Sequence, residues 1–87
     1  MTTIEDDRTI EQRATHNWAV VGTDPFMSGW GRAENGPSYA AWATTADNLE
    51  NVEYWVRSRG DMHRVRIVNL NDYRPRHAAH LHIYVGR

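Results

Sequence analysis

The sixteen residues TADNLENVEYWVRSRG (45–60) decide the fold, because they carry the clearest helical pattern in the chain. Apolar side chains return there every three or four residues, which is the spacing of one helix face. Thr45 is a good N-cap with Asp47 in the first turn, and Gly60 stands where a helix commonly ends. The pattern predicts an amphipathic helix of about four turns. Its stripe is Ala46, Leu49, Val52, Val56 and Arg59.

The other side of this predicted helix is acidic. Asp47, Glu50 and Glu53 recur there, while Trp55 flanks the apolar stripe and is expected to seal its edge. Charged residues of this kind usually lie on a solvated face. The three acids are nevertheless an alternative partner-binding surface.

Two extended segments precede the helix and two follow it. Residues 17–22 (NWAVVG) are apolar and β-branched, and residues 38–45 (SYAAWATT) resume an extended pattern, so we expect a hairpin across a long loop. Residues 63–70 (HRVRIVNL) and 80–86 (HLHIYVG) alternate apolar with polar side chains. The prediction is an α+β domain of order β-β-α-β-β, with one helix packed on an antiparallel sheet.

The first fifteen residues are polar and acidic, and Ile4 and Ile10 are their only sizeable apolar side chains. They predict a frayed arm or one short helix over residues 1–15, ahead of a single domain over residues 16–87. This N-terminus is not signal-like, and the chain has no run of about 18 apolar residues. We therefore expect a cytoplasmic protein with no membrane partner.

The residue types that are missing restrict the chemistry. The 87-residue chain has no Cys, and all ten of its basic residues are Arg. Without Cys there are no disulfides or thiolate metal ligands, and without Lys there is neither a Walker A loop nor a Schiff-base lysine. A chain this short also has one modest core and little room for an enclosed active site.

Charge is divided between the two parts of the chain. Residues 1–54 hold nine acids and three Arg, a balance of −6, whereas residues 55–87 hold seven Arg and two Asp, a balance of +5. This division predicts either opposite electrostatic faces that meet a charged partner or two halves that neutralise each other in the fold.

The C-terminal histidines are the first candidates for chemistry. His77, His80 and His82 form an H-x2-H-x-H pattern, and the last two share one face of a strand. A structural zinc site needs four ligands and the sequence places no acid nearby, so a solvated strand face is favoured and we expect no metal or other cofactor. No serine lies in a G-x-S-x-G context; the three considered are Ser28, Ser38 and Ser58. The chain is therefore predicted not to be an enzyme.

Arginine and aromatic side chains converge if the last two strands are neighbours. The alternation in residues 63–70 turns Arg64 and Arg66 away from the helix, with Arg74 and Arg76 at the margin of the same surface. Arg beside aromatic rings suits phosphate binding with base stacking, and also acidic protein surfaces. The predicted partner-binding residues are Arg64, Arg66, Arg74, Arg76, His80, His82 and Tyr84.

The loop PFMSGWGRAE (25–34) contains large apolar side chains between glycines. Either Phe26 and Trp30 fold inward and plug the open end of the sheet, or Trp30 projects as an interface anchor. We expect Trp30 to be mostly buried, and keep it as an alternative partner-binding residue.

The same loop takes part in a resemblance. The segments WAVVGTDPFMSGWGRAENG (18–36) and VRSRGDMHRVRIVNLNDYRP (56–75) resemble a recurrent family of small phage-encoded and prophage-encoded proteins. These pair a D-x-F-M-S-G-W-G segment with a later R-x-D-M-x-x-V-R segment. The match covers about residues 17–75 and leaves out the acidic arm and the His-rich tail.

The resemblance implies a viral accessory protein of the host cytoplasm without enzymatic activity. Phage proteins of this size often inhibit host defence, and anti-CRISPR proteins are among them. The expected function is stoichiometric inhibition of a host protein machine, with a CRISPR effector complex as the expected partner. The alternative is an accessory module that binds nucleic acid through the Arg/His/Tyr sheet face, although such domains are usually clearly basic and this chain has a net charge of −1.

Overall fold

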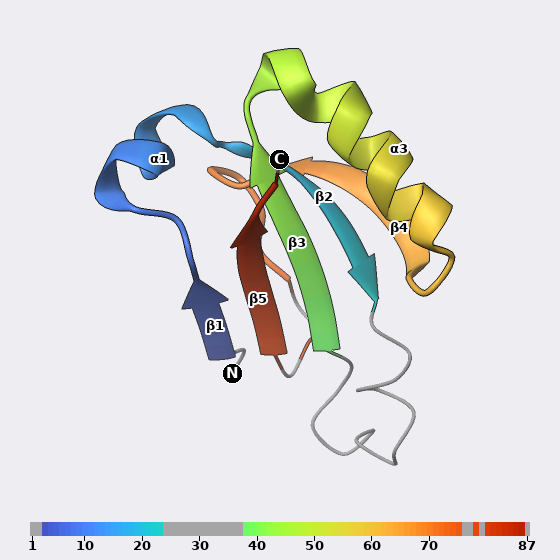
Figure 1. Cartoon of the computed structure of the whole chain (residues 1–87). Helices are drawn as coiled ribbons and strands as arrows, with labels where there is room; N and C mark the ends of the chain where they lie inside the picture. The colour runs from blue at the N-terminus through green and yellow to red at the C-terminus, as the bar shows by residue number, and fades with distance from the viewer. Residues whose placement is uncertain (1–2, 24–37, 76–77, 79, 87) are drawn as a thin grey trace.

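A single five-stranded sheet organises the chain in the computed structural model, which describes residues 3–23, 38–75, 78 and 80–86 (Figure 1). The spatial order of the strands is β1-β5-β3-β2-β4. Along the chain the elements are β1 (Thr3–Asp6), α1 (Ile10–Thr15), β2 (Trp18–Thr23), β3 (Ser38–Thr44), the 3-10 turn η2 (Ala46–Asn48), α3 (Leu49–Arg59), β4 (His63–Asn69) and β5 (His80–Val85). Among these residues, no helix is both long and apolar enough to cross a membrane.

The α+β class is confirmed, but the predicted order β-β-α-β-β and the antiparallel sheet are wrong. The hairpin of β2 and β3 is antiparallel as expected, and β4 pairs with the outer side of β2. In contrast, β5 runs parallel to β3, and β1 runs parallel to β5. The reason lies in the connection before β5. It leads from β4 at one edge of the sheet, past β2 and β3, to β5, whereas a tight hairpin would have reversed the chain direction.

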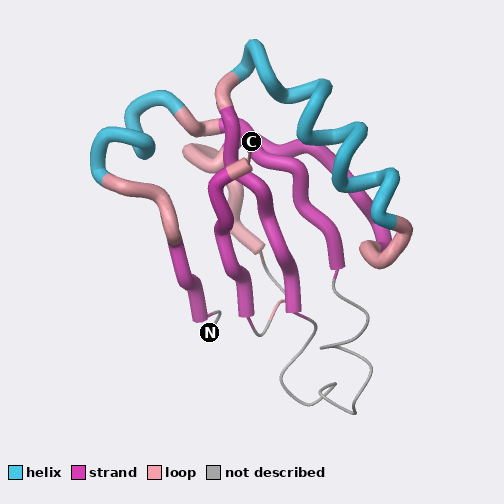
Figure 2. The backbone as a smooth tube through the Cα atoms, in the orientation of Figure 1, coloured by secondary structure: helices cyan, strands magenta, loops and turns pink. Residues whose placement is uncertain are grey.

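Helix α3 covers one face of the sheet, as its sequence pattern predicted. Val52 and Val56 are buried and pack against Val20, Ala40 and Trp42 from the two central strands. Gly60 ends the helix in the left-handed region at φ 75°, also as predicted. The start differs slightly, because Thr45 precedes the 3-10 turn and α3 begins at Leu49. Figure 2 shows α3 lying over the side of the sheet that ends in β4.

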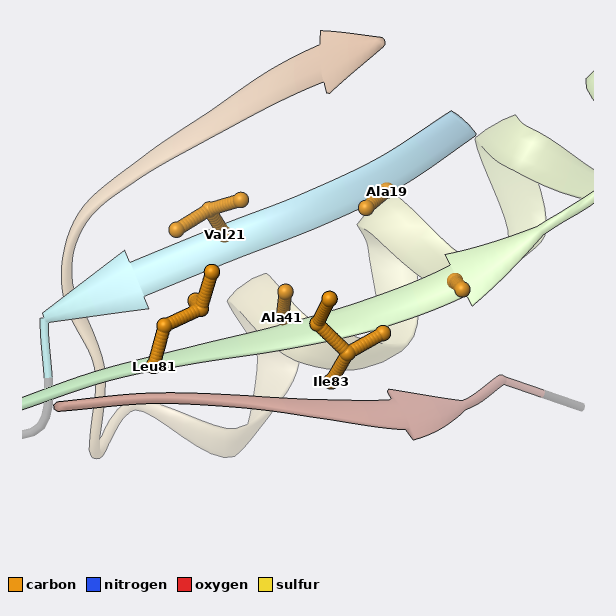
Figure 3. Close-up of a cluster of buried hydrophobic side chains, with 6 residues drawn as sticks. Ala19, Val21, Ala41, Leu81 and Ile83 are labelled. Atoms are coloured by element: carbon orange, nitrogen blue, oxygen red, sulfur yellow. The ribbon is translucent and has the colours of Figure 1, made fainter. Parts of the chain in front are cut away.

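The opposite face of the sheet carries a second apolar cluster (Figure 3). Its buried members are Ala19, Val21, Ala41, Ala43, Leu81 and Ile83. Leu70 and Tyr73, from the segment that follows β4, pack onto this cluster. Alanines at three of the six positions leave room for that segment to approach the strands closely. Both faces of the central strands are therefore covered, which explains their nearly continuous apolar sequence.

The N-terminal residues supply the strand that the sequence did not predict. Strand β1 adds to the outer side of β5, and Asp7 N–H extends the pairing by donating to the Ile83 carbonyl at 2.8 Å. The short helix that was one expectation for this region is α1, which begins with Thr9 and Gln12 in a capping box. Between the two elements, the Arg8 side chain donates two hydrogen bonds to the Asp6 carboxylate and one to the His16 carbonyl. These bonds fix the segment against the sheet.

Candidate interaction site: an aromatic tract beside α3

Helix α3 does not cover the whole of the sheet face on which it lies. The helix packs over β2, β3 and β4, whereas β5 and β1 lie toward the opposite edge of the sheet, beside the helix (Figure 1). The register pairs His82 with Ala40 and Tyr84 with Trp42. Since Ala40 and Trp42 belong to the cluster beneath α3, the side chains of His80, His82 and Tyr84 share that face.

A row of rings leads from α3 across β3 to β5, the neighbour of β1, and then follows β5. Trp42 meets Trp55 edge to face, with centroids 5.7 Å apart, and stacks on Tyr84 with centroids 5.6 Å apart. The Tyr84 ring is nearly parallel to that of His82, at 4.0 Å, and His80 follows at 6.2 Å. We call these five residues, Trp42, Trp55, His80, His82 and Tyr84, the aromatic tract. It joins strands β3 and β5 to helix α3.

The tract is buried at its centre and exposed at both sides. Trp42 has only 6% of its surface accessible, whereas Trp55 has 45% and Tyr84 has 37%. Offset-stacked and edge-to-face rings attract each other beyond the area they bury. Both exposed rings, Trp55 and Tyr84, therefore pack against a core residue.

Arg59 closes the α3 end of the tract. Its guanidinium carbon lies 5.0 Å from the Trp42 ring centroid and 5.2 Å from that of Trp55, within cation–π distance of both. The same guanidinium donates a 2.7 Å hydrogen bond to the Asp61 carboxylate. The site thus already holds one guanidinium between two indole rings and an acid.

Two carboxylates of the N-terminal segment close the other end. His82 Nδ1 lies 3.0 Å from Glu5 Oε2, and His82 Nε2 lies 3.0 Å from Asp7 Oδ2. His80 Nε2 is farther from Glu5, at 3.7 Å. The expectation that no acid lies near these histidines is wrong, because β1 pairs with β5 and brings both acids alongside. Even so, no group of three or more His, Asp or Glu among the described residues is placed to hold a metal ion.

The predicted basic surface is divided between the two faces of the sheet. Strands β4 and β5 are not neighbours, since β2 and β3 lie between them. Arg66 pairs in register with Val21, whose side chain is in the cluster opposite α3. It therefore faces away from the helix, as expected, but also away from His80, His82 and Tyr84. The proposed convergence of Arg64 and Arg66 with these three residues is wrong.

The environment of Arg66 also differs from a free basic face. Its guanidinium carbon lies 4.7 Å from the Tyr39 ring centroid, and Nη2 donates a 3.4 Å hydrogen bond to the Tyr73 hydroxyl. Burial raises the pKa of Tyr73 above its ordinary value of 10.0, against the lowering effect of this bond. Arg64 is exposed and has φ 56° at an irregularity of the β2–β4 pairing, where strand alternation no longer fixes its direction.

Other predicted residues lie apart from the tract or outside the described chain. Arg74 is exposed and lines a pocket of about 280 Å³ on the face opposite α3, where Asp6 and Arg8 form its polar side. The Arg8 guanidinium holds the pKa of the Asp6 carboxyl below its ordinary value of 3.8. Arg76, His77 and the loop containing Trp30 lie outside the described residues.

The acidic residues of the helical segment have an ordinary surface arrangement. Asp47 and Glu50 are exposed, and Glu53 forms a 3.0 Å ion pair with Arg57 one turn later. Pairs of this kind contribute little to stability. Among the described residues, no hydrogen bond or ion pair joins Asp47, Glu50 or Glu53 to the aromatic tract.

Sequence reasoning missed Trp42, Trp55, Arg59, Glu5 and Asp7 as members of a site. The alternation in residues 38–45 did contain a signal, because it places Trp42 in phase with Ala40 and Tyr39 out of phase. The sequence did not indicate which strand lies beside β3. Only the parallel pairing of β3 with β5 puts Tyr84 beside Trp42.

Comparison with known proteins identifies no matching family model, no significantly similar curated protein and no significantly similar solved structure.

Proposed function

We propose that this is a non-enzymatic binding protein and that the aromatic tract is its contact surface. The observation that carries the proposal is the pair of exposed rings, Trp55 and Tyr84, both in contact with the buried ring of Trp42. Trp and Tyr are enriched among the residues that dominate binding energy at protein interfaces. A protein that needed these rings only for its core would gain by burying them further.

The rigidity of the tract supports the same proposal. Binding costs free energy when flexible side chains are ordered, and rings that are already held by stacking avoid much of that cost. Trp42 anchors the centre, while Arg59 and His82 restrain the two ends. The rings therefore offer a preorganised surface.

The charges around the tract favour a protein over a nucleic acid. Glu5, Asp7 and Asp61 have about half of their side-chain surface exposed, at 56%, 53% and 50%. Carboxylates repel a phosphate backbone, and nucleic-acid binding usually depends on many Lys or Arg contacts to phosphates. The tract does not offer them.

The class of partner comes from the resemblance to small phage-encoded proteins. On that basis we propose a stoichiometric inhibitor of a host defence machine in the host cytoplasm, with a CRISPR effector complex as the target. Inhibition of this kind needs an interface and no catalytic group.

Binding of purified CRISPR effector complexes of different types by the full chain tests the proposal. The parent is expected to bind one of them, and Trp55→Ser with Tyr84→Ser is expected to weaken the affinity at least about tenfold, because interface aromatics are frequent hot spots. Ile10→Ser with Tyr54→Ser is the matched control, since it removes two exposed apolar side chains outside the tract. Equal affinity of the tract variant and the parent would contradict the tract as contact surface.

The alternative function is nucleic-acid binding through Arg66, Arg74 and the adjoining tyrosines, and a separate experiment distinguishes it from protein binding. Fluorescence-polarisation titrations with single- and double-stranded oligonucleotides measure it directly. Micromolar binding that weakens steeply with salt and is lost on Arg66→Glu with Arg74→Glu would favour this alternative over the tract. Reversal of Asp47 and Glu50 to Arg, in the effector experiment, tests the acidic helix face in the same way.

A further inference from the structure

We infer that the aromatic tract receives an arginine-bearing segment of the protein partner, with the guanidinium placed against the tract rings and the carboxylates of Glu5 and Asp7. This inference rests on the proposed function, since it states the chemistry of the partner at that surface. It commits to a basic protein segment rather than to a second copy of this chain.

Charge complementarity is the first argument. Three exposed carboxylates, from Glu5, Asp7 and Asp61, border the tract. Asp61 is already paired with the Arg59 guanidinium at 2.7 Å. Glu5 and Asp7 share the single imidazole of His82, which carries at most one positive charge, so the β1 end of the tract holds the excess negative charge. Complementary charge steers encounter and fixes the orientation of two binding surfaces.

The molecule itself provides the second argument, because it already binds guanidinium groups in this manner. Arg59 lies over two indole rings while an acid accepts its hydrogen bond, and Arg66 lies over Tyr39 while the Tyr73 hydroxyl accepts another. A planar guanidinium stacks on rings and donates in the plane at the same time, which an ammonium group does not. Arginine is therefore favoured over lysine.

Glu5 and Asp7 also retain hydrogen-bonding capacity. Each carboxylate can accept about four hydrogen bonds. Within the described part of the chain, Glu5 Oε2 and Asp7 Oδ2 each meet one nitrogen of His82, and the only other polar neighbour is His80 at 3.7 Å from Glu5 Oε1. Asp7 Oδ1 and Glu5 Oε1 therefore keep acceptor capacity for a forked donor.

The opposite sheet face supports the choice of surface. Arg66 and Arg74 lie on that side, and the one acid that lines its pocket, Asp6, is held by Arg8. A basic segment is repelled there and attracted to the tract. The arginines Arg66 and Arg74 and the exposed acids Glu5 and Asp7 therefore lie on opposite faces of the sheet.

The test uses the full chain and a hexa-arginine peptide, acetylated and amidated, titrated by calorimetry and by amide and indole chemical shifts. The parent is expected to bind with shifts concentrated at Trp55, Tyr84 and strand β1. Glu5→Gln with Asp7→Asn, which preserves shape and removes two charges, is expected to weaken binding at least about fivefold. Hexa-lysine, of equal charge, is expected to bind about threefold or more weakly than hexa-arginine.

Glu11→Gln with Asp72→Asn is the matched control, because it removes two charges from exposed acids away from the tract and should change binding less than about twofold. If the Glu5/Asp7 variant loses the amide pattern of β1, Glu5→Gln alone replaces it, with a smaller expected loss. Equal affinity of the tract variant and this control, or shifts centred on Arg66 and Arg74, would overturn the inference.

The two proposals fail in different ways. Suppose that the Trp55/Tyr84 variant no longer binds the effector complex, that the parent does not bind hexa-arginine, and that the Glu5/Asp7 variant binds the effector complex as the parent does. The tract is then the contact surface and the arginine inference is wrong. If the Trp55/Tyr84 variant keeps full affinity for the effector complex, the proposed function of the tract fails first.

Discussion

Tyr84 stacks on Trp42 across two parallel strands, with ring centroids 5.6 Å apart and planes inclined by 20°. One ring is almost fully buried and the other is accessible, so the pair connects the core to the surface. Substitutions along the tract should therefore separate the free energy of unfolding from partner affinity.

Trp42→Ala is expected to lower the free energy of unfolding by about 3–5 kcal/mol, the usual range for a buried large aromatic. Trp55→Ser should cost much less, because Trp55 is 45% exposed. Urea denaturation followed by circular dichroism measures both. Equal losses for the two variants would show that the rings do not differ in burial as the structure has them.

Val56→Asp should unfold the protein or nearly so. Val56 is fully buried between α3 and the sheet, and an unpaired carboxylate there costs several kcal/mol, a large part of the stability of so small a domain. Ser58→Asp, at an exposed position of the same helix, is the control. Thermal melts compare the two variants with the parent. An unchanged midpoint for Val56→Asp would mean that the packed face of α3 is assigned wrongly.

Asp6 predicts a dependence of stability on acidic pH. Its hydrogen bonds to Arg8 lower its pKa in the folded state below the ordinary 3.8, so the unfolded state takes up a proton first as the pH falls. This contribution is present above about pH 4 and is lost as the pH falls through the folded-state pKa. Asp6→Asn should be less stable than the parent at pH 7, and the difference should shrink toward pH 2.

Asp72→Asn, at an exposed position, should keep the parental pH profile in the same denaturation series. A constant difference between Asp6→Asn and the parent from pH 7 to pH 2 would rule out the Asp6–Arg8 interaction as the cause.

Tyr73 predicts the opposite dependence at alkaline pH. Burial raises its pKa in the folded state above 10.0, so the unfolded state releases the proton first as the pH rises. The contribution is present below pH 10 and is lost as the pH rises through the folded-state pKa. Tyr73→Phe should flatten this fall in stability, whereas Tyr54→Phe, at an exposed helical position, should not. Parallel alkaline profiles for the two variants would contradict the prediction.

Arg64 and Arg66 should respond differently to charge reversal. Arg66→Glu loses the contacts with the Tyr39 ring and the Tyr73 hydroxyl and should cost about 1–2 kcal/mol, whereas Arg64→Glu, at an exposed position, should cost less than about 0.5 kcal/mol. Chemical denaturation of the two single variants compares them. A larger loss for Arg64→Glu than for Arg66→Glu would contradict the stabilising role of the Arg66 contacts with Tyr39 and Tyr73.

The local elements could be predicted from the sequence, and their neighbours could not. Helix α3 and its buried valines follow from the helical spacing of apolar residues, and its end follows from the glycine at position 60. The β2–β3 hairpin follows from two apolar runs. In contrast, β1 is a run of Thr, Ile, Glu and Asp that carries no strand pattern, and it forms a strand because β5 presents a free edge to it.

The composition of the candidate site depends on the strand order, which could not be predicted from the sequence. His80, His82 and Tyr84 were identified as one strand face, and the structure keeps them together. Their partners changed from the arginines of β4 to Trp42, Trp55 and Arg59 because strand order decides which side chains meet. Alternation fixes the face on which a residue lies and leaves the lateral neighbour open.

The pairing of β1 with β5 has a consequence for the rate of folding. Thr3 is opposite His80 and Asp6 is opposite Ile83, so this ladder joins segments more than seventy residues apart in sequence. Long-range parallel pairing raises the contact order, because loop-closure entropy must be lost before the ladder forms. The chain should therefore fold slowly for its size, in milliseconds to seconds rather than microseconds. The acids that β1 brings to His82 would then be among the last groups to reach their native positions.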